Sequence, residues 1–565
     1  MTALLTDNLP LLAGAPNGIK KLRELILELA VRGKLVPQDP TDEPASELLE
    51  RIAEQKARLV AEGKIRKAKA TYEEFAEISY EIPSTWAVSS LGQVVEIVRG
   101  ITFPASEKSK KPELGRVACL RTANVQDEIE WDDLLYIRES FVSRHDQYIE
   151  PHDIVMSMAN SRELVGKVAL IGAELKQKTT FGGFLGVLRP VLIEPRFVMA
   201  LLRTPHARSA LIDSASQTTN IANVSLGKLK PLPFAIPPIA EQHRIVAKVG
   251  ELIALCDRLE AQQADAESAH AQLVQALLDC LTQASDAADL AANWQRLSEH
   301  FHTLFTESSI DALKQTLLQL AVMGKLVPQD PSDEPASELL KRIAEEKARL
   351  VAEGKIKKQK PLTEIGEEEK PFDVPANWEW VRVAAVGHDW GQKTPDKAFT
   401  YIDVGAVNNA AGRISAPQVL MAEDAPSRAR KVVRPGTVIY STIRPYLLNI
   451  AVVEETYEQE PIASTAFAII HPYLEMPARY FLCYLRSPVF VRYVESVQMG
   501  IAYPAINDGQ FFSGLIPLPP LAEQHRIVAK LDELMALCDQ LKARLAHARQ
   551  LNEQLADTLV EQAVA

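Results

Sequence analysis

The chain has 565 residues, of which 47% are hydrophobic and 24% charged, so it should hold several soluble domains that each bury a core. No apolar run reaches the length of a membrane span, and the first residues, MTALLTDNLP, lack the basic-then-apolar pattern of a secretory signal. Five cysteines without close pairing argue against a disulfide framework and favour a cytoplasmic protein with reduced thiols.

The net charge of −12 argues against a generic nucleic-acid binder, but its distribution is uneven. Residues 78–238 carry 18 Lys and Arg against 17 Asp and Glu, and residues 371–518 carry 12 against 14. Residues 239–370 carry 15 against 23. If the two near-neutral regions touch DNA, they should do so mainly through base edges and shape, with partner proteins supplying more of the phosphate-neutralising charge.

The N-terminal region predicts two helices. Apolar residues at helical spacing indicate a helix over 19–31, which stops at Gly33. A second helix begins near Pro44 and stops at Gly63. The segment 30–65 returns as 321–356 with only four of 36 positions changed, so the same helix pair should occur twice.

A second repeat follows each variable region. Residues 237–259 (PPIAEQHRIVAKVGELIALCDRL) return as 519–541 (PPLAEQHRIVAKLDELMALCDQL). Apolar residues in each copy alternate at steps of four and three, as in the a/d seam of packed long helices, with Cys256 and Cys538 at equivalent positions. The C-terminal copy extends this seam without an internal Pro or Gly.

The regions between the repeats differ strongly, yet faint echoes link them. Ile82-Pro83-Ser84-Thr85-Trp86 parallels Val374-Pro375-Ala376-Asn377-Trp378, and residues 151–157 parallel residues 435–441. Short β-prone runs at 165–171 and 438–440 alternate with helical stretches at 196–202 and 478–485, which predicts a mixed α/β domain in each region.

The order of the repeats predicts a circular duplication. The central region runs from the second repeat into the first, and joining the C-terminus to the N-terminus would recreate that order. We therefore expect an α+β protein with pseudo-two-fold character. It should contain a helical segment at 1–70, an insert at 71–236, a central helical region at 237–370, an insert at 371–518 and a C-terminal helix at 519–565.

In the repeated motifs LAVxGKLVPQDPxDEPASELLxRIAExKARL and PPxAEQHRIVAK, with two unlike inserts between them, the chain resembles the specificity subunit of type I restriction–modification systems. The resemblance implies two target recognition domains, each reading half of a bipartite, asymmetric site in double-stranded DNA. Long antiparallel helical connectors would set the spacer between the halves. It further implies two methyltransferase (modification) subunits and two restriction subunits as partners, with S-adenosylmethionine, ATP and Mg²⁺ bound by those partners.

No motif for catalysis or metal binding is evident. The sequence lacks a GxxxxGK[ST] phosphate loop, an Asn-Pro-Pro-Tyr or Asp-Pro-Pro-Tyr tetrapeptide, and a Cys/His set with zinc spacing. We therefore predict a non-catalytic chain without metal ligands. The alternative is a coiled-coil scaffold whose inserts bind protein partners.

The candidate DNA-contacting residues are polar side chains in segments that interrupt the apolar strands. Polar side chains are chosen because Arg can hydrogen-bond to guanine, and Asn and Gln can hydrogen-bond to adenine. The alternative for each is an ordinary loop or capping residue. In the first insert they are Arg121, Asn124, Asn160, Ser161, Arg162, Gln217, Thr218, Thr219 and Asn220. In the second they are Gln392, Lys393, Thr394, Tyr440, Ser441, Arg444, Tyr503 and Asn507.

Overall fold

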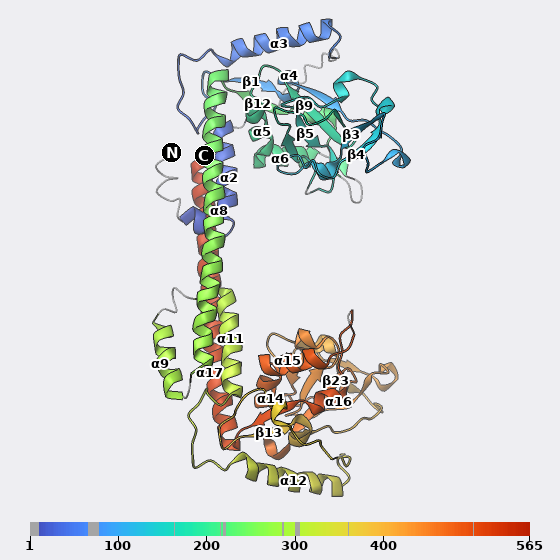
Figure 1. Ribbon diagram of the computed structural model, residues 1–565, viewed down its shortest axis with the longest axis vertical. Helices are drawn as coiled ribbons and strands as arrows, with labels where there is room; N and C mark the ends of the chain where they lie inside the picture. The colour runs from blue at the N-terminus through green and yellow to red at the C-terminus, as the bar shows by residue number, and fades with distance from the viewer. Residues whose placement is uncertain are drawn as a thin grey trace. The chain divides into compact units, whose positions relative to one another are not determined.

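The computed structural model of the protein describes residues 11–65, 78, 80–162, 164–214, 216–217, 222–284, 287–299, 305–359, 361–500 and 502–564. The chain divides into two compact units, Met1–Asp265 with Arg549–Ala565, and Ala266–Ala548. Each unit holds one insert together with repeated helices (Figure 1). Helices and sheets occur in both units, which confirms the predicted α+β class.

The first repeat forms the same two helices in each unit, as predicted. They are α2 (Gly18–Val31) and α3 (Ala45–Ala61) in the first unit, and α11 (Glu307–Val322) and α12 (Ala336–Ala352) in the second. The residue that ends α2 must be glycine for two reasons, its backbone conformation and the closeness of a neighbouring side chain. Gly33 has a φ of +69°, and a Cβ there would lie 2.5 Å from Cγ of Pro83. Gly324 has the same geometry against Pro375. In both units the end of the helix therefore packs directly against the start of the insert.

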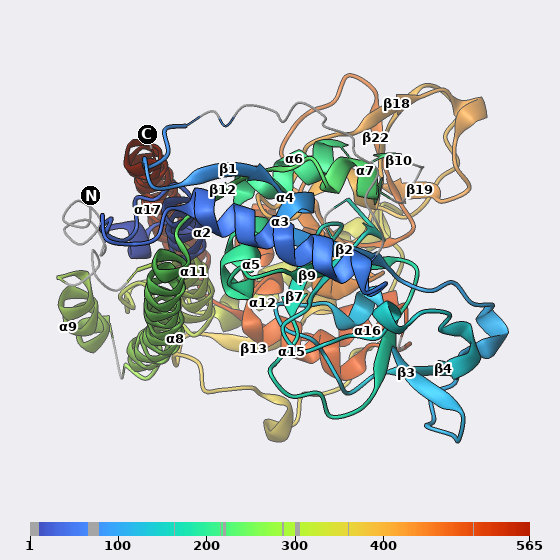
Figure 2. The same ribbon diagram turned by 90° about the horizontal axis from the view of Figure 1, so that it is seen from above.

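Helix α3 lies across α4 (Leu91–Val94), as Figure 2 shows. The contact is polar, since the Lys56 ammonium donates hydrogen bonds to the carbonyl oxygens of Gly92 (2.9 Å) and Val95 (3.0 Å). Burial lowers the pKa of Lys56. The helix is thus attached to the insert by a cation that satisfies backbone acceptors.

The second repeat opens two 44-residue helices, α8 (Ile239–Thr282) and α17 (Leu521–Val564). In the first unit, Cys256 from the early part of α8 shares a buried cluster with Ala556 from the end of α17. In the second unit, Leu278 from late α8 shares a cluster with Leu531 from early α17. The two helices are therefore antiparallel within each unit, and the seam predicted from apolar spacing is buried.

A buried polar joint ties each insert to its long helix. The carboxylate of Glu241, which is 0% exposed, accepts hydrogen bonds from Trp86 Nε1 (3.0 Å) and Gln38 Nε2 (2.7 Å). Burial raises the pKa of Glu241, and the two hydrogen bonds act in the opposite direction. Beside it, Arg244 donates to both carboxylate oxygens of Asp42 at 3.2 and 2.5 Å. Both repeats and the insert's first tryptophan meet at this joint.

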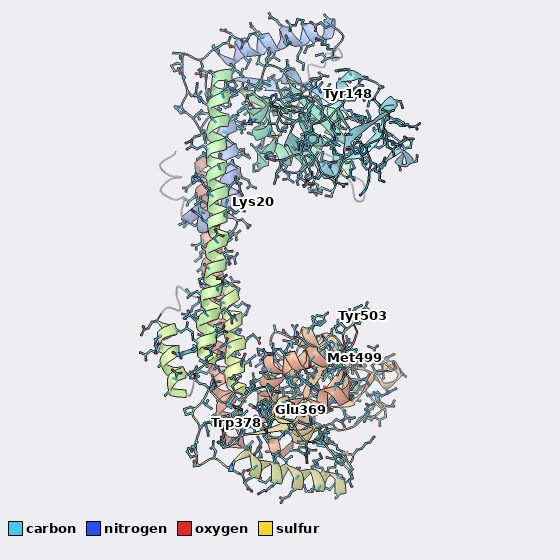
Figure 3. The ribbon with its side chains drawn as sticks, in the orientation of Figure 1. Lys20, Tyr148, Glu369, Trp378, Met499 and Tyr503 are labelled. Atoms are coloured by element: carbon cyan, nitrogen blue, oxygen red, sulfur yellow. The ribbon has the colours of Figure 1, made fainter. Side chains whose placement is uncertain are left out.

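The second unit repeats the joint atom for atom. Glu523, also 0% exposed, accepts from Trp378 Nε1 at 2.9 Å and from Gln329 Nε2 at 2.6 Å. Arg526 donates to Asp333 at 3.2 and 2.6 Å. Figure 3 shows Trp378 close to the helices of its unit. The paired Pro-x-x-Trp segments noted in the sequence therefore mark two equivalent attachment points.

The first insert contains a sheet in the order β2-β9-β5-β7 and a sheet in the order β4-β3-β8, in which β3 and β8 are parallel. The pair β1-β12 brings the entering and leaving chain together. These strands are β1 (Ala87–Ser90), β2 (Val95–Arg99), β3 (Arg116–Leu120), β4 (Leu135–Arg138), β5 (Ile154–Ser157), β7 (Val168–Leu170), β8 (Thr179–Phe181), β9 (Leu185–Pro190) and β12 (Pro233–Ile236). Helices α5 (Pro195–Arg203), α6 (Pro205–Ser214) and α7 (Leu226–Leu229) lie between β9 and β12 in the chain.

The second insert has the same topology despite its different sequence. The order β14-β23-β20-β21 matches β2-β9-β5-β7, the parallel pair β15-β22 matches β3-β8, and β13-β24 matches β1-β12. These strands are β13 (Glu379–Arg382), β14 (Gly387–His388), β15 (Phe399–Ile402), β20 (Val438–Ser441), β21 (Ile450–Val452), β22 (Glu460–Ser464), β23 (Phe467–Pro472) and β24 (Leu515–Leu518). The common topology supports the relationship that the faint sequence echoes indicate.

The second insert extends both of its sheets. The additional strands are β16 (Val407–Asn408), β17 (Arg413–Ile414) and β19 (Ala429–Val432). Strand β18 (Gln418–Leu420) is not additional, because it pairs antiparallel with β15 and occupies the place of β4. The insert's helices are α13 (Val383–Val386), α14 (Ala478–Leu485), α15 (Pro488–Val497) and α16 (Asp508–Ser513).

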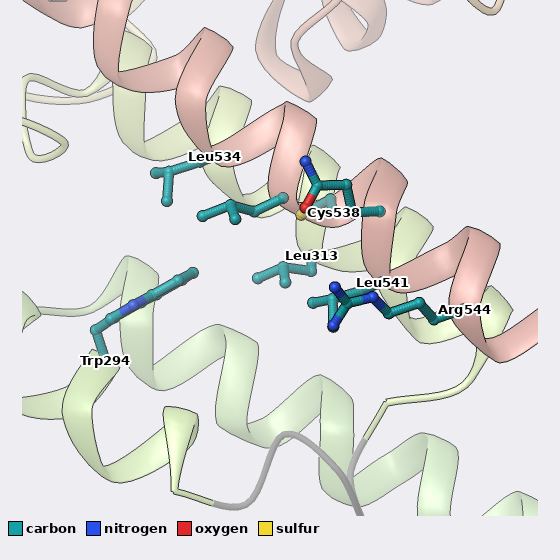
Figure 4. Close-up of a pocket in the computed structure, with 8 residues that line it drawn as sticks. Trp294, Leu313, Leu534, Cys538, Leu541 and Arg544 are labelled. Carbon is teal, nitrogen blue, oxygen red and sulfur yellow. The ribbon is translucent and has the colours of Figure 1, made fainter.

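The second unit also contains α9 (Ala287–Ser298), which the sequence analysis did not anticipate. Leu290 and Leu297 of this helix are buried in the core of that unit. Between α9, α11 and α17 lies a cavity of about 220 Å³, with Trp294 and Leu313 on two of its sides (Figure 4). Helix α9 therefore covers the long helix incompletely.

Candidate nucleic-acid interface

The first insert has an open cleft of about 640 Å³ at the ends of its strands. Three cations line it, Arg99 at the end of β2, Lys108 and Arg121. Phe103 and Phe184 add aromatic surface, and Phe184 is 64% exposed. Polar lining comes from Thr102, Thr122, Asn223 and Ser225. A cleft that combines cations, polar groups and exposed rings can hold both phosphate and base edges.

The cleft wall depends on a close approach of two backbones. A Cβ on Gly100 would lie 2.1 Å from the carbonyl oxygen of Gly182, so only glycine fits there. The carbonyl of the next exposed residue, Phe184, accepts a hydrogen bond from the Met158 amide at 2.8 Å. These contacts fix the turn between β8 and β9 and hold the Phe184 ring at the cleft.

Arg121 is held in its position by neighbours. Its Nη2 donates to the carboxylate (2.6 Å) and carbonyl (2.8 Å) oxygens of Asp133, and this hydrogen bond lowers the pKa of Asp133. Asn124 accepts from the Arg121 amide and donates to the carbonyl oxygens of Glu130 and Asp133. Asn124 is only 1% exposed and engaged in this loop, so the structure does not bring its side chain to the surface of the cleft.

A small three-stranded sheet, β10-β11-β6, lies beside the cleft. Asn160 in β6 (Ala159–Asn160) pairs with Ala222 of β11 (Ala222–Asn223), and Gln217 of β10 (Ser216–Gln217) pairs with the same residue from the other side. The structure therefore places the predicted positions 160 and 217 in one small sheet, on the two strands that flank β11. Ser161 and the exposed Arg162 follow β6 directly. Thr218, Thr219 and Asn220 lie outside the described residues.

The second insert forms the same three-piece feature with shorter pairing. Ala505 bridges to Ile443 on one side and to Met499 on the other. Arg444 and Tyr503, two predicted positions, meet here, with the guanidinium carbon 5.1 Å from the ring centroid. The exposed large hydrophobic residues of these segments are Ile443, Tyr446, Leu447, Met499 and Tyr503. We call this set, together with Arg444, the apolar patch.

The remaining predicted residues of the second insert lie elsewhere or are engaged internally. Lys393 donates to Glu460 Oε2 at 2.6 Å, a contact that raises its pKa, and Asn507 caps α16 by accepting from the Gln510 amide at 2.9 Å. Gln392, which bridges to Lys431, and Thr394 are exposed on the chain beside Lys393.

Tyr440 and Ser441 are each 1% exposed in β20, the strand between β21 and β23. All four residues of this strand are buried, so the structure does not place these two predicted side chains on the surface of the insert.

Several exposed residues of the cleft and the patch were missed by the sequence analysis. Arg99, Lys108, Phe184 and Met499 have no distinguishing local pattern, and they become visible only when strands from distant parts of the chain meet. The exposed apolar side chains among these four also lie outside the polar residues that the sequence singles out. Within the described ranges, no group of three or more His, Cys, Asp and Glu side chains could hold a metal ion. In the same ranges, no helix is long and apolar enough to cross a membrane.

Known proteins resemble this chain over nearly its whole length. Residues 83–267 and 392–548 match the family described as "Type I restriction modification DNA specificity domain". The chain is 38% identical to the type I restriction enzyme EcoAI specificity subunit of Escherichia coli, across 97% of this chain and 94% of that protein. It is 37% identical to the EcoEI specificity subunit of Escherichia coli with the same coverage. The solved HsdS subunit from Thermoanaerobacter tengcongensis is 37% identical, covering 33% of this chain and 49% of that one, with a TM-score of 0.31.

Proposed function

The chain belongs to the family of type I restriction–modification DNA specificity subunits, and we propose that each insert reads one half of a bipartite, asymmetric site in double-stranded DNA. The observation that carries this proposal is a contrast between the units. Their topology and their Trp–Glu–Gln joint are the same, whereas the surfaces at the ends of their strands differ. Two units with the same fold and attachment but different DNA-facing surfaces are what a site with two different halves requires.

The first insert supplies a cationic cleft with Arg99, Lys108 and Arg121, and the second supplies the apolar patch with Arg444. Cations fix the position of a protein on phosphates or bridge guanine, and apolar side chains contact the methyl group of thymine. The two inserts are therefore equipped to prefer different bases.

The repeated helices are the proposed docking sites for two modification subunits, to which two restriction subunits add in the complete enzyme. Two nearly identical sequences, 30–65 and 321–356, fit two copies of one partner. Methylation and cleavage belong to these partners in the proposal, together with S-adenosylmethionine, ATP and Mg²⁺.

The test of this function is the methylated motif in the DNA of a host that carries the system. Deleting the chain should abolish methylation of one bipartite motif, and restoring it should bring the same motif back. The exposed Leu114 lies outside the cleft and the patch, so L114S is a matched control that should restore the motif fully. An unchanged set of methylated sites after deletion would contradict the proposal and favour a protein-binding scaffold.

We propose further that α8 and α17 set the spacer between the half-sites, since each helix contributes residues to both units. Inserting seven residues after Asp265 and seven after Ala548 keeps the a/d spacing of both helices. The added length is about 10 Å, or about three base pairs. The methylated motif should then have a longer spacer and unchanged half-sites. The original spacer in such a variant would refute this role.

A further inference from the structure

The most unusual surface of the second insert is the apolar patch. Met499 is 61% exposed, Tyr503 69% and Tyr446 52%, and Ile443 and Leu447 add to the same two segments. Large apolar side chains scattered singly on a surface need no explanation, but five on two paired segments mark a contact site. Figure 3 shows Met499 and Tyr503 at the rim of the insert.

The backbone under the patch is held in an unfavourable conformation. Arg444 and Leu448 both have positive φ, +48° and +53°, which side chains of this size rarely adopt. The Arg444 amide donates to the Pro504 carbonyl at 2.8 Å, and Met499 and Ala505 exchange two backbone hydrogen bonds of 2.9 Å. Strain that the surrounding contacts maintain is typical of a binding loop with a fixed presentation.

The patch is organised rather than loose. The guanidinium of Arg444 stacks over the Tyr503 ring at 5.1 Å from the centroid. Gly500 has a φ of +92°, and a Cβ there would come within 2.8 Å of the Tyr503 carbonyl oxygen. The stack holds the Tyr503 ring against its own loop. Tyr503 is therefore placed to contact a base edge with its ring surface, and not to insert between base pairs.

We propose that the apolar patch reads thymine through its 5-methyl group in the major groove, with Met499 and Tyr503 as the specificity-determining residues. This inference rests on the proposed DNA-reading function and adds its chemistry. Among the base edges of the major groove, only thymine offers an apolar group. Arg444 supplies the positive charge that suits the neighbouring phosphates, whereas the cleft of the first insert has three cations and is expected to read polar edges.

The test uses the full chain in complex with its modification subunits and a duplex carrying its methylated motif. The half-site read by the second insert is identified as the half that changes when residues 374–518 are replaced. Deoxyuridine in place of thymine removes only the methyl group. Each contacted methyl should be worth about a fourfold change in affinity. Substitution in the second half-site should therefore weaken binding about fourfold per contacted methyl, and in the first half-site less than twofold.

Variants then assign the effect to the patch. M499S and Y503S should weaken binding to the thymine duplex and lose the difference between thymine and deoxyuridine, while L114S should keep it. Equal affinity for both duplexes in the unchanged chain would overturn the inference, and so would a second half-site without any A·T pair. Strong fluorescence from 2-aminopurine beside the patch would indicate a wedge between base pairs and also overturn it. An unchanged set of methylated sites after deletion of the chain would instead be a failure of the proposed function.

Discussion

The buried joint between each insert and its long helix gives the sharpest stability prediction. The change is Glu241→Ala, which removes the acceptor of Trp86 Nε1 and Gln38 Nε2. The Trp86 side chain is 6% exposed, so its N–H gains little from water when the carboxylate is lost. Gln38 keeps a weaker contact with the Gly33 carbonyl at 3.3 Å.

The magnitude follows from these contacts. A hydrogen bond to a charged group contributes about 1.5–3 kcal/mol, and an orphaned buried donor costs about 1–3 kcal/mol. Release of the desolvated carboxylate offsets part of this loss, because burial alone already raises the pKa of Glu241. We expect a decrease of about 3 kcal/mol in the unfolding free energy of the first unit. Glu241→Gln keeps one acceptor and should cost about half as much.

Hydrogen exchange followed by mass spectrometry measures the effect in each unit separately. E241A should accelerate exchange about a hundredfold in β1, β12 and the start of α8, in line with the expected free-energy change. E523A should do the same in β13, β24 and the start of α17, because the two joints have the same geometry. A change below about 0.5 kcal/mol, the size of an ordinary surface substitution, would refute the reasoning. Equal acceleration in both units by one substitution would also refute it.

Three further predictions concern the cavity beside α9, the buried His471 and the cleft of the first insert. Trp294→Ala should lower the unfolding free energy of the second unit by about 2 kcal/mol in calorimetry, because it enlarges the cavity under α9, without altering the methylated motif. Burial among aromatic rings lowers the pKa of His471 to about 4. As the pH falls, the imidazole of His471 is therefore protonated in the unfolded chain before it is protonated in the folded one. The free energy of unfolding of the second unit should decrease as the pH drops from about 6.5 to 4. H471L should flatten that slope in urea unfolding at a series of pH values. Arg99→Ala and Lys108→Ala should each reduce the slope of log affinity against log salt by about 1, whereas Lys178→Ala, whose amine is bound to Glu139, should not.

The helices could be predicted from the sequence because their signals are local. Glycine stops, apolar spacing and an extended seam placed α2, α3, α8 and α17, and the helical stretch 478–485 matches α14 residue for residue. The repeat order also indicated two equivalent units. In these elements, the residues that decide the structure lie within one or two helical turns of each other.

The reading surfaces could be predicted only in part, because they depend on strand neighbours. Tyr440 resembles a surface residue in sequence, but β20 is covered on both sides and its ring packs against Phe511. The side chain of Asn124 is polar, but it donates its hydrogen bonds to carbonyl oxygens of its own loop. Arg444 and Tyr503 lie far apart in the chain, and their meeting needs the Ile443–Ala505 bridge, which no local pattern announces.

The central claim, that each insert reads its own half-site, is tested most directly by making the two inserts the same. Residues 374–518 can be replaced by a second copy of residues 82–236, because the Pro-x-x-Trp entry and the Pro-Pro exit are shared. The methylated motif should then become an inverted repeat of the half-site read by the first insert. A motif that still contains the second half-site would contradict the account.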